Sequence, residues 1–303
     1  MNNIGTSKGT SAMKKSVVFV ISSMLLICVS SGLFWYGKQQ IDKQLPQYQY
    51  GQVKIDERHP LNNLVPNPAC SINISLQYIK TPLNEASDLI NKTISKKLFD
   101  KENNLEKQSN IFAKQYRDRY IADIAPLYAQ EETGSHVEGW YNYSYKADGK
   151  FDNGCFGVLN YLIQTTEYEG GAHSIPMCIY LNFDKNSGAL ITADSIYAEG
   201  YEKKLNEMLL DALMKKLHIS KIQELKKLGY LSTTSIYPPD NFLLKEEGIL
   251  YYYNVYEIAP YALGATQLTI SYGDLGDILR DDFKDKYSDS SIKRVINYYS
   301  KEK

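Results

Sequence analysis

The chain has 303 residues, of which 43% are hydrophobic and 23% are charged, the ordinary balance of a protein that buries a core. Its 34 basic and 35 acidic side chains give a net charge of −1. This balance argues against a nucleic-acid-binding protein, because such proteins normally carry a basic patch. The 26 Tyr, against 2 Trp and 9 Phe, favour a sheet-rich domain or a recognition surface, since Tyr is common in strands and at interfaces.

Residues 16–36 form an apolar stretch without a charged side chain, and it is long enough to cross a bilayer as a helix. Two lysines precede it, so the positive-inside rule places residues 1–15 in the cytoplasm. We therefore expect a membrane anchor, with the main domain extracytoplasmic, either periplasmic or at the cell surface. Two alternatives stay open: a signal peptide cleaved near Ser30-Ser31-Gly32, and a lipid-modified Cys28.

Residues 37–68 are polar and rich in proline, and we interpret them as a stalk. Residues 71–80 alternate apolar and polar side chains, which is the period of a half-buried strand. Two amphipathic helices are predicted next, one starting at Pro82 and one over residues 104–127, with Pro126 marking the end of the second.

A run of strands follows these helices. We predict strands at residues 137–146, 156–168, 176–183 and 189–192, with turns at Asp148-Gly149, Asn153-Gly154 and residues 184–188. The rest of the chain predicts helices at residues 199–217, 220–228 and 274–280, a hairpin of residues 242–244 and 248–254, and a strand at residues 267–271. Because strands and helices come in runs, the pattern favours an α+β fold with antiparallel sheets and packed amphipathic helices, preceded by one transmembrane helix.

Three cysteines, Cys70, Cys155 and Cys178, lie in the part of the chain that the anchor would export. An exported compartment permits disulfides, and three cysteines allow one bridge. We expect a Cys70–Cys155 bridge, because each of these residues precedes a strand-like run. The alternative is that all three are reduced and buried as small apolar side chains.

Gly170, Gly171, Ala172 and His173 form a loop between two predicted strands. Two glycines permit positive φ angles and a close backbone approach, so the loop is either a tight hairpin or a segment presented to a ligand. The four histidines, at positions 59, 136, 173 and 218, have no metal-binding spacing, and we predict neither a metal nor a cofactor.

A second presented loop is predicted at residues 256–264. Pro260 stiffens its backbone, and Tyr261 offers a rigid aromatic anchor of the kind found at binding hot spots. The alternative is that Tyr256 and Tyr261 simply pack over the sheet. Since the sequence contains no nucleophile elbow, phosphate-binding loop or dinucleotide fingerprint, we assign no catalytic residue and favour a binding protein over an enzyme.

Both loops carry a resemblance to a known family. The first motif is YxGGAH at residues 168–173, followed by the strand at 180–184, and the second is the strand at 248–253 that leads into residues 256–264. These residues resemble the extracytoplasmic domain of unknown function in the lysozyme-sensing anti-sigma factor RsiV and the peptidoglycan deacetylase PdaC. Residues 69–164 resemble the smaller domain that precedes it in those proteins.

The resemblance implies an α+β fold on the envelope side of the membrane and, in one branch of the family, lysozyme binding. The sigma-binding and deacetylase parts of those relatives have no counterpart in this sequence, so the resemblance carries neither activity over to this chain. The expected domain organisation is a cytoplasmic N-terminus (1–15), an anchor (16–36), a stalk (37–68), a smaller α+β domain (69–164), a larger C-terminal domain (165–284) and a charged tail (285–303).

The sequence therefore predicts an envelope-anchored binding or sensing module that recognises a lysozyme-like protein or cell-wall glycan. The binding residues that we expect are Tyr168, Gly170, Gly171, Ala172, His173, Pro260 and Tyr261. The alternative function is an enzyme or accessory factor in peptidoglycan modification, in which His173 would act as acid or base.

Overall fold

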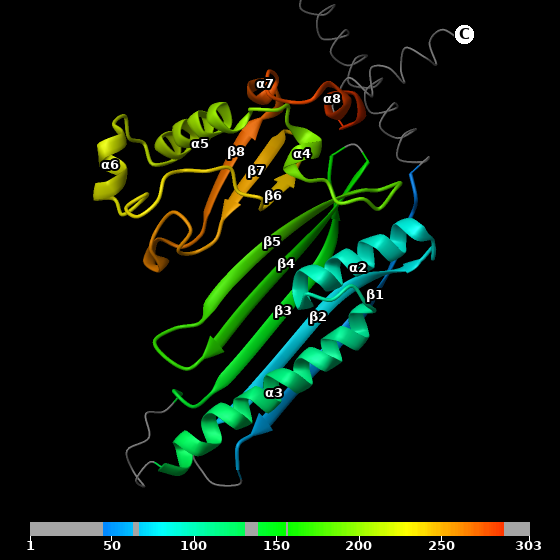
Figure 1. The fold of residues 1–303 in the computed structure, drawn as a ribbon, viewed down its shortest axis with the longest axis vertical. Coiled ribbons are helices and arrows are strands. Elements are labelled where there is room, and N and C mark those ends of the chain that lie inside the picture. The colour runs from blue at the N-terminus through cyan, green and yellow to red at the C-terminus, as the bar shows by residue number, and fades with distance from the viewer. Residues whose placement is uncertain (1–44, 63–66, 131–138, 156, 288–303) are drawn as a thin grey trace, which may run out of the picture.

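The computed structural model describes residues 45–62, 67–130, 139–155 and 157–287, and within them the fold contains a five-stranded and a three-stranded sheet (Figure 1). The large sheet has the order β1 (Gln49–Pro60), β2 (Ala69–Thr81), β3 (Tyr143–Asn153), β4 (Val158–Glu169) and β5 (Ile175–Asp184). The small sheet has the order β6 (Phe242–Leu244), β7 (Gly248–Tyr253) and β8 (Thr266–Ser271). The predicted α+β class is confirmed.

The helices lie between and after these strands. They are α2 (Glu85–Phe99), α3 (Leu105–Gln130), α4 (Ala193–Ile196), α5 (Glu202–Lys216), α6 (Ile222–Lys227), the short 3-10 helix η1 (Tyr261–Leu263), α7 (Tyr272–Leu275) and α8 (Asp281–Tyr287). Helices α2 and α3 cover one face of the large sheet, whereas α5, α7 and α8 lie with the small sheet at the other end of the molecule (Figure 1).

The large sheet is mixed, and the expectation of purely antiparallel sheets is wrong for one pair of strands. Strands β2 and β3 run parallel, with a register from Cys70↔Tyr143 to Leu76↔Gly149, while the other neighbouring pairs are antiparallel. The physical reason is the connection between them. Helices α2 and α3 form a long crossover that returns the chain to the end at which β2 began, as parallel strands require.

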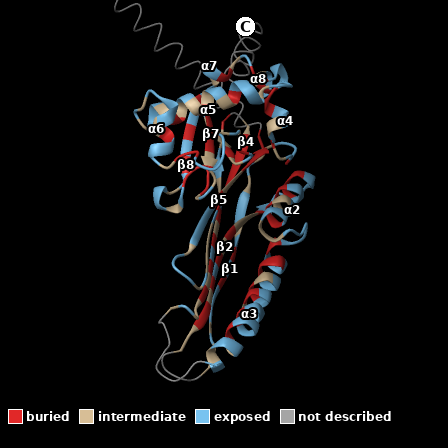
Figure 2. Ribbon diagram, turned by 60° about the vertical axis from the view of Figure 1, so that its left-hand side comes forward, coloured by how far each residue is buried: buried red, intermediate tan, exposed pale blue. Residues whose placement is uncertain are grey.

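Strand alternation gives the large sheet two chemically different faces. On the apolar face, Ile72, Ile74 and Leu76 of β2 pack with Ile90 of α2 and Tyr120 of α3, and all five are buried. Figure 2 shows such buried residues in the strands beside α3. We call the opposite side the polar face; it carries the alternate residues Ser71, Asn73, Ser75, Lys146, Asp148, Gln164 and Thr166.

A second hydrophobic cluster joins the small sheet to helices α5, α7 and α8. It includes Val158 at the start of β4, so the small sheet and its helices, which we call the second lobe, pack against one end of the large sheet. Side-chain amides of asparagine make the connection. The amide of Asn182 donates to the Phe242 carbonyl oxygen at 2.8 Å and accepts from the Leu244 N–H at 2.8 Å, as a backbone peptide group would.

The predicted stalk is wrong for residues 49–60, which form β1 and pair with β2 along its whole length. Val53 and Ile55 are buried in the core under α3, and they alternate with the exposed Lys54 and Asp56. Because β1 is the edge strand and buries so few apolar side chains, its sequence has only a weak strand period.

The predicted Cys70–Cys155 disulfide is also wrong, because Cys70, Cys155 and Cys178 are free and buried. Cys70 pairs with Tyr143 at the start of β3, whereas Cys155 follows the end of that strand. At the rise of an extended chain this separates them by roughly 35 Å, far beyond the reach of a disulfide. Their burial as reduced residues matches the alternative interpretation.

Two local predictions also need correction. The Asp148-Gly149 pair is no turn but lies within β3, where Gly149 is needed because a Cβ would come 2.8 Å from Leu76 Cδ2 and would collide with the Tyr161 hydroxyl. Helix α3 does not end at Pro126 but continues to Gln130, and Tyr128 in its last turn packs edge-on against Tyr141 with ring centroids 5.6 Å apart.

The proposed anchor at residues 16–36 lies outside the described residues, as does most of the charged tail. Within the described ranges, the structure has no helix whose length and apolar character suit a membrane span. The domain boundary predicted between residues 164 and 165 falls inside β4.

Candidate functional site

The two loops that the sequence singles out meet in the structure. Residues 170–174 connect β4 to β5 at the edge of the large sheet, and residues 254–265 connect β7 to β8 in the second lobe. The Tyr261 hydroxyl donates to the Ser174 carbonyl oxygen at 3.0 Å, which joins the loops directly. Two segments more than 80 residues apart in the chain therefore form one surface.

Backbone geometry explains the glycines of the first loop. Gly170 has a φ of +83° and lies so close to the Trp140 carbonyl oxygen that a Cβ would approach it to 2.7 Å. Gly171 has a φ of +93°, which side-chain-bearing residues rarely adopt. Tyr168 closes the loop from below, because its hydroxyl lies 3.0 Å from the Gly171 carbonyl oxygen. These three residues shape the loop.

The second loop holds one tyrosine in a strained conformation. Tyr256 has a φ of 70°, an outlier for a bulky residue, while its side chain is 57% exposed. The turn is fixed beneath it, because the Glu257 carboxylate accepts from the Asn254 N–H at 3.0 Å. Burial raises the pKa of Glu257, and the bonds from Asn254 and Tyr237 only partly oppose that rise.

His173, Tyr256 and Tyr261 form what we call the aromatic surface. The rings of His173 and Tyr261 stack with centroids 3.8 Å apart and planes inclined by 13°. Tyr256 stands beside them, with its ring centroid 5.7 Å from that of Tyr261 and its hydroxyl 3.4 Å from His173 Nε2. His173 and Tyr256 are exposed and Tyr261 is half-buried, so the rings present their faces and edges to solvent.

The predicted binding residues fall into two groups. His173 and Tyr261 belong to the aromatic surface, and Ala172 and Pro260 lie exposed beside it. Tyr168 and the two glycines position the first loop rather than line the surface. The sequence placed Tyr256 in the second presented loop but did not single it out as a binding residue; the signal that could have found it is a second tyrosine five residues from Tyr261 in the same loop.

The chemistry available at this surface is that of recognition. Stacked rings offer flat apolar faces, and the histidine nitrogens and tyrosine hydroxyls offer hydrogen bonds at the edges. The described contacts of the His173 ring nitrogens are to the Ser174 carbonyl oxygen, 3.3 Å from Nδ1, and to the Tyr256 hydroxyl. In the part of the chain that the structure describes, no three His, Cys, Asp or Glu side chains gather as metal ligands would.

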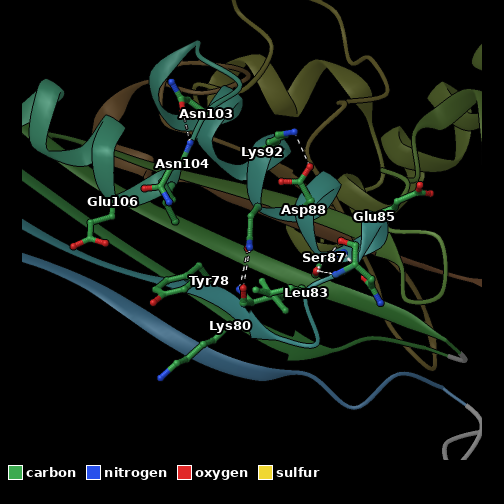
Figure 3. A pocket seen from close by; sticks show the side chains of 14 residues that line it. Tyr78, Lys80, Leu83, Glu85, Ser87, Asp88, Lys92, Asn103, Asn104 and Glu106 are labelled. Atoms are coloured by element: carbon green, nitrogen blue, oxygen red, sulfur yellow. Dashed lines mark hydrogen bonds and ion pairs between the residues drawn. The ribbon is translucent and has the colours of Figure 1, made fainter.

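A pocket of about 690 Å³ lies elsewhere, between the end of β2, the first turns of α2 and the start of α3 (Figure 3). Most of its polar groups already bond to one another. Lys92 pairs with Asp88 at 2.6 Å, and Asn91 binds both the N–H and the carbonyl oxygen of Ile79 at 2.9 Å. The side chain of Asn84 caps α2. The polar lining of this pocket therefore serves mainly to hold β2 and α2 together.

One family model matches the part of the chain that contains the second loop. Residues 194–273 match the family model described as protein of unknown function (DUF3298). The match contains Tyr256 and Tyr261 but not His173, so the aromatic surface is built partly from the family segment and partly from the loop before it.

Relatives extend the similarity over more of the chain. The peptidoglycan-N-acetylmuramic acid deacetylase PdaC of Bacillus subtilis strain 168 is 28% identical over 140 residues, which cover 43% of this chain and 30% of that protein. The chain thus spans less than a third of the length of this curated relative. The predicted resemblance to the family is confirmed.

Two solved structures share the fold. A DUF3298 family member from Bacteroides fragilis is 28% identical, with a TM-score of 0.74 over 80% of this chain and 98% of that one. A DUF3298 family protein from Pseudomonas aeruginosa has a TM-score of 0.57 over 78% of this chain and 96% of that one, at 15% identity, and shows the fold alone. The similarity in structure therefore includes the large sheet as well as the second lobe.

Proposed function

We propose that this chain is an extracytoplasmic binding module, tethered by residues 16–36, that recognises cell-wall glycan through the aromatic surface. The observation that carries the proposal is the stack of His173 on Tyr261 with the exposed Tyr256 beside it. Aromatic faces pack well against the C–H faces of sugar rings, and the polar groups at their edges can meet sugar hydroxyls.

The strained backbone of Tyr256 supports a role for its side chain. A non-glycine residue in the left-handed region costs on the order of 1–3 kcal/mol, and a glycine would avoid that cost. Since the Tyr256 side chain is mostly exposed, its burial does not repay the strain. The deacetylase PdaC, which shares 28% identity over 140 residues, is named for a reaction on peptidoglycan, and this favours a wall glycan as the ligand.

The test is co-sedimentation of the purified protein with insoluble peptidoglycan, followed by calorimetry with soluble wall fragments. We expect binding that Tyr256→Ala weakens at least tenfold. Tyr50→Ala is the matched control: Tyr50 is a 40% exposed tyrosine at the start of β1, at the far end of the large sheet from the loops, and its loss should leave binding unchanged.

Two results would contradict this function. Binding to lysozyme but not to wall material would reassign the aromatic surface to a protein partner. Turnover of wall material that His173→Ala abolishes would establish an enzyme in place of a binding module.

A further inference from the structure

A groove of about 590 Å³ opens beside the aromatic surface. Its floor is the part of the polar face formed by strands β3, β4 and β5, and its wall is the segment of residues 261–265 that follows the aromatic loop. Tyr261 lines the groove and also stacks on His173, so the groove and the aromatic surface are continuous. A ligand resting on the rings could therefore extend along the strands that form the floor.

The floor of the groove offers polar groups that the fold does not use. Gln164 and Thr166 lie two positions apart on β4 and face the groove, and their side chains make no hydrogen bond to any other residue that the structure describes. On the neighbouring strand, Lys146 and Asp148 form an ion pair at 3.3 Å, so their charges largely cancel. The floor therefore presents hydrogen-bond donors and acceptors with little net charge.

The wall of the groove is apolar. It consists of Leu263, which is 41% exposed, and the small residues Ala262, Gly264 and Ala265. Met177 of β5 also belongs to the lining, but it pairs with Thr165, two positions from the buried Ile163, so its side chain lies on the apolar side of the sheet. An apolar wall above a polar floor suits a ligand that has both C–H surfaces and many hydroxyls.

The strand ladder also gives the groove a direction. Gln164 is paired with Asp148 and Cys178, and Thr166 with Lys146 and Pro176, so two rows of side chains cross the sheet. Residues two apart on a strand are separated by roughly 7 Å. A chain molecule lying along the strands would meet one row after another, whereas a single small ring would reach only one.

We propose that this groove binds the continuing sugar units of a linear, uncharged oligosaccharide whose first ring rests on the aromatic surface. This inference rests on the proposed function and specifies its ligand as a chain rather than a terminal sugar. The paired charges of Lys146 and Asp148 make the groove unsuited to a polyanion, since it offers no unpaired cation among the described residues of its lining. Its polar floor is equally unsuited to a lipid tail.

The experiment measures affinity against ligand length by calorimetry, with the full chain in detergent and β-1,4-linked N-acetylglucosamine oligomers of one to six units as probes. We expect affinity to rise at least tenfold from the dimer to the hexamer. The double variant Gln164→Ala, Thr166→Val should bind the dimer as the parent does but lose the gain with length. Gln52→Ala, a glutamine on the same face but outside the groove, is the matched control.

The outcomes separate this inference from the proposed function. Equal affinity for all lengths, with Tyr256→Ala still weakening binding, overturns the groove and leaves the aromatic surface in place. A gain with length that survives the double variant also overturns the groove. Failure of the parent protein to bind any oligomer or wall material overturns both.

Discussion

The two faces of the large sheet are formed by the same strands but have different roles. On the apolar face, Ile72, Ile74 and Leu76 of β2 are buried under α2 and α3. On the polar face, the residues between them are serines and asparagines. At one end of the sheet the asparagines of this face are buried under the second lobe, and farther along the strands the face is open and forms the groove. One face therefore holds the fold together. The other face binds the second lobe at one end and leaves the remainder of its surface open to a ligand.

The largest effect should come from the apolar face. Ile74 is 1% exposed, and Ile74→Ala should lower the free energy of unfolding by about 2–5 kcal/mol, because it removes buried methyl groups and leaves a cavity. Urea unfolding followed by circular dichroism measures the change. The control is Ser75→Ala on the polar face, which should change the free energy by less than about 0.5 kcal/mol. Equal losses in the two variants would refute the division of roles.

A smaller effect is expected at Asp184, a buried carboxylate where the polar face meets α8. Burial alone would raise its pKa, but bonds from Lys286, Tyr287 and Ser187 outweigh burial and lower the pKa to about 2. Since the folded pKa lies below the ordinary value of 3.8, the stabilisation is present above pH 4 and is lost as the pH falls towards 2.

The difference in pKa corresponds to about 2 kcal/mol. Measuring the free energy of unfolding between pH 6 and pH 2 should show this loss in the parent protein and not in Asp184→Asn. Lys54→Ala, which removes an exposed charge on β1, is the control and should keep the slope of the parent. A parent curve that runs parallel to that of Asp184→Asn would refute the role of this carboxylate.

The hydrogen bonds of Asn182 to β6 should hold the second lobe on the large sheet. Asn182→Ala leaves the Leu244 N–H and the Phe242 carbonyl oxygen without their partner, and both are buried, so it should cost about 1–3 kcal/mol. Hydrogen exchange should show the added opening in β6 and β7 rather than in β2. Asn73→Ala, an exposed asparagine on the same face, is the control. An equal loss of protection in the large sheet and in the second lobe would mean that the two parts unfold as one unit.

The sequence predicted what local patterns encode. Residues 71–77 alternate polar and apolar side chains and lie within β2, and the hairpin of β6 and β7 lies where its apolar runs place it. It did not predict the features that depend on contacts between residues far apart in the chain. Strand β1 carries few apolar side chains and is recognisable only through its pairing with β2, and Gly149 resembles a turn residue until the ring of Tyr161 is placed beside it.

The candidate site was likewise predictable only in its local features. Two presented loops were predicted from their glycines, proline and tyrosines, but their contact through His173 and Tyr261 depends on how the second lobe packs on the edge of β5. The groove left no sequence signal, because Gln164 and Thr166 read as ordinary outward residues of a half-buried strand. Only the register with β3 and β5 brings them together with Lys146 and the wall of the second lobe.

The smallest effect is the sharpest test of the comparison, since it uses two adjacent residues of β4. Ile163 is fully buried on the apolar face, and Gln164 is exposed on the polar face. Gln164→Ala should change the free energy of unfolding by less than about 0.5 kcal/mol, because its side chain bonds to no other described residue. Ile163→Val, which removes one methyl group, should cost about 0.5–1.5 kcal/mol. If Gln164→Ala proves the more destabilising of the two, its side chain holds the fold, and a loss of ligand binding in that variant would no longer identify a groove.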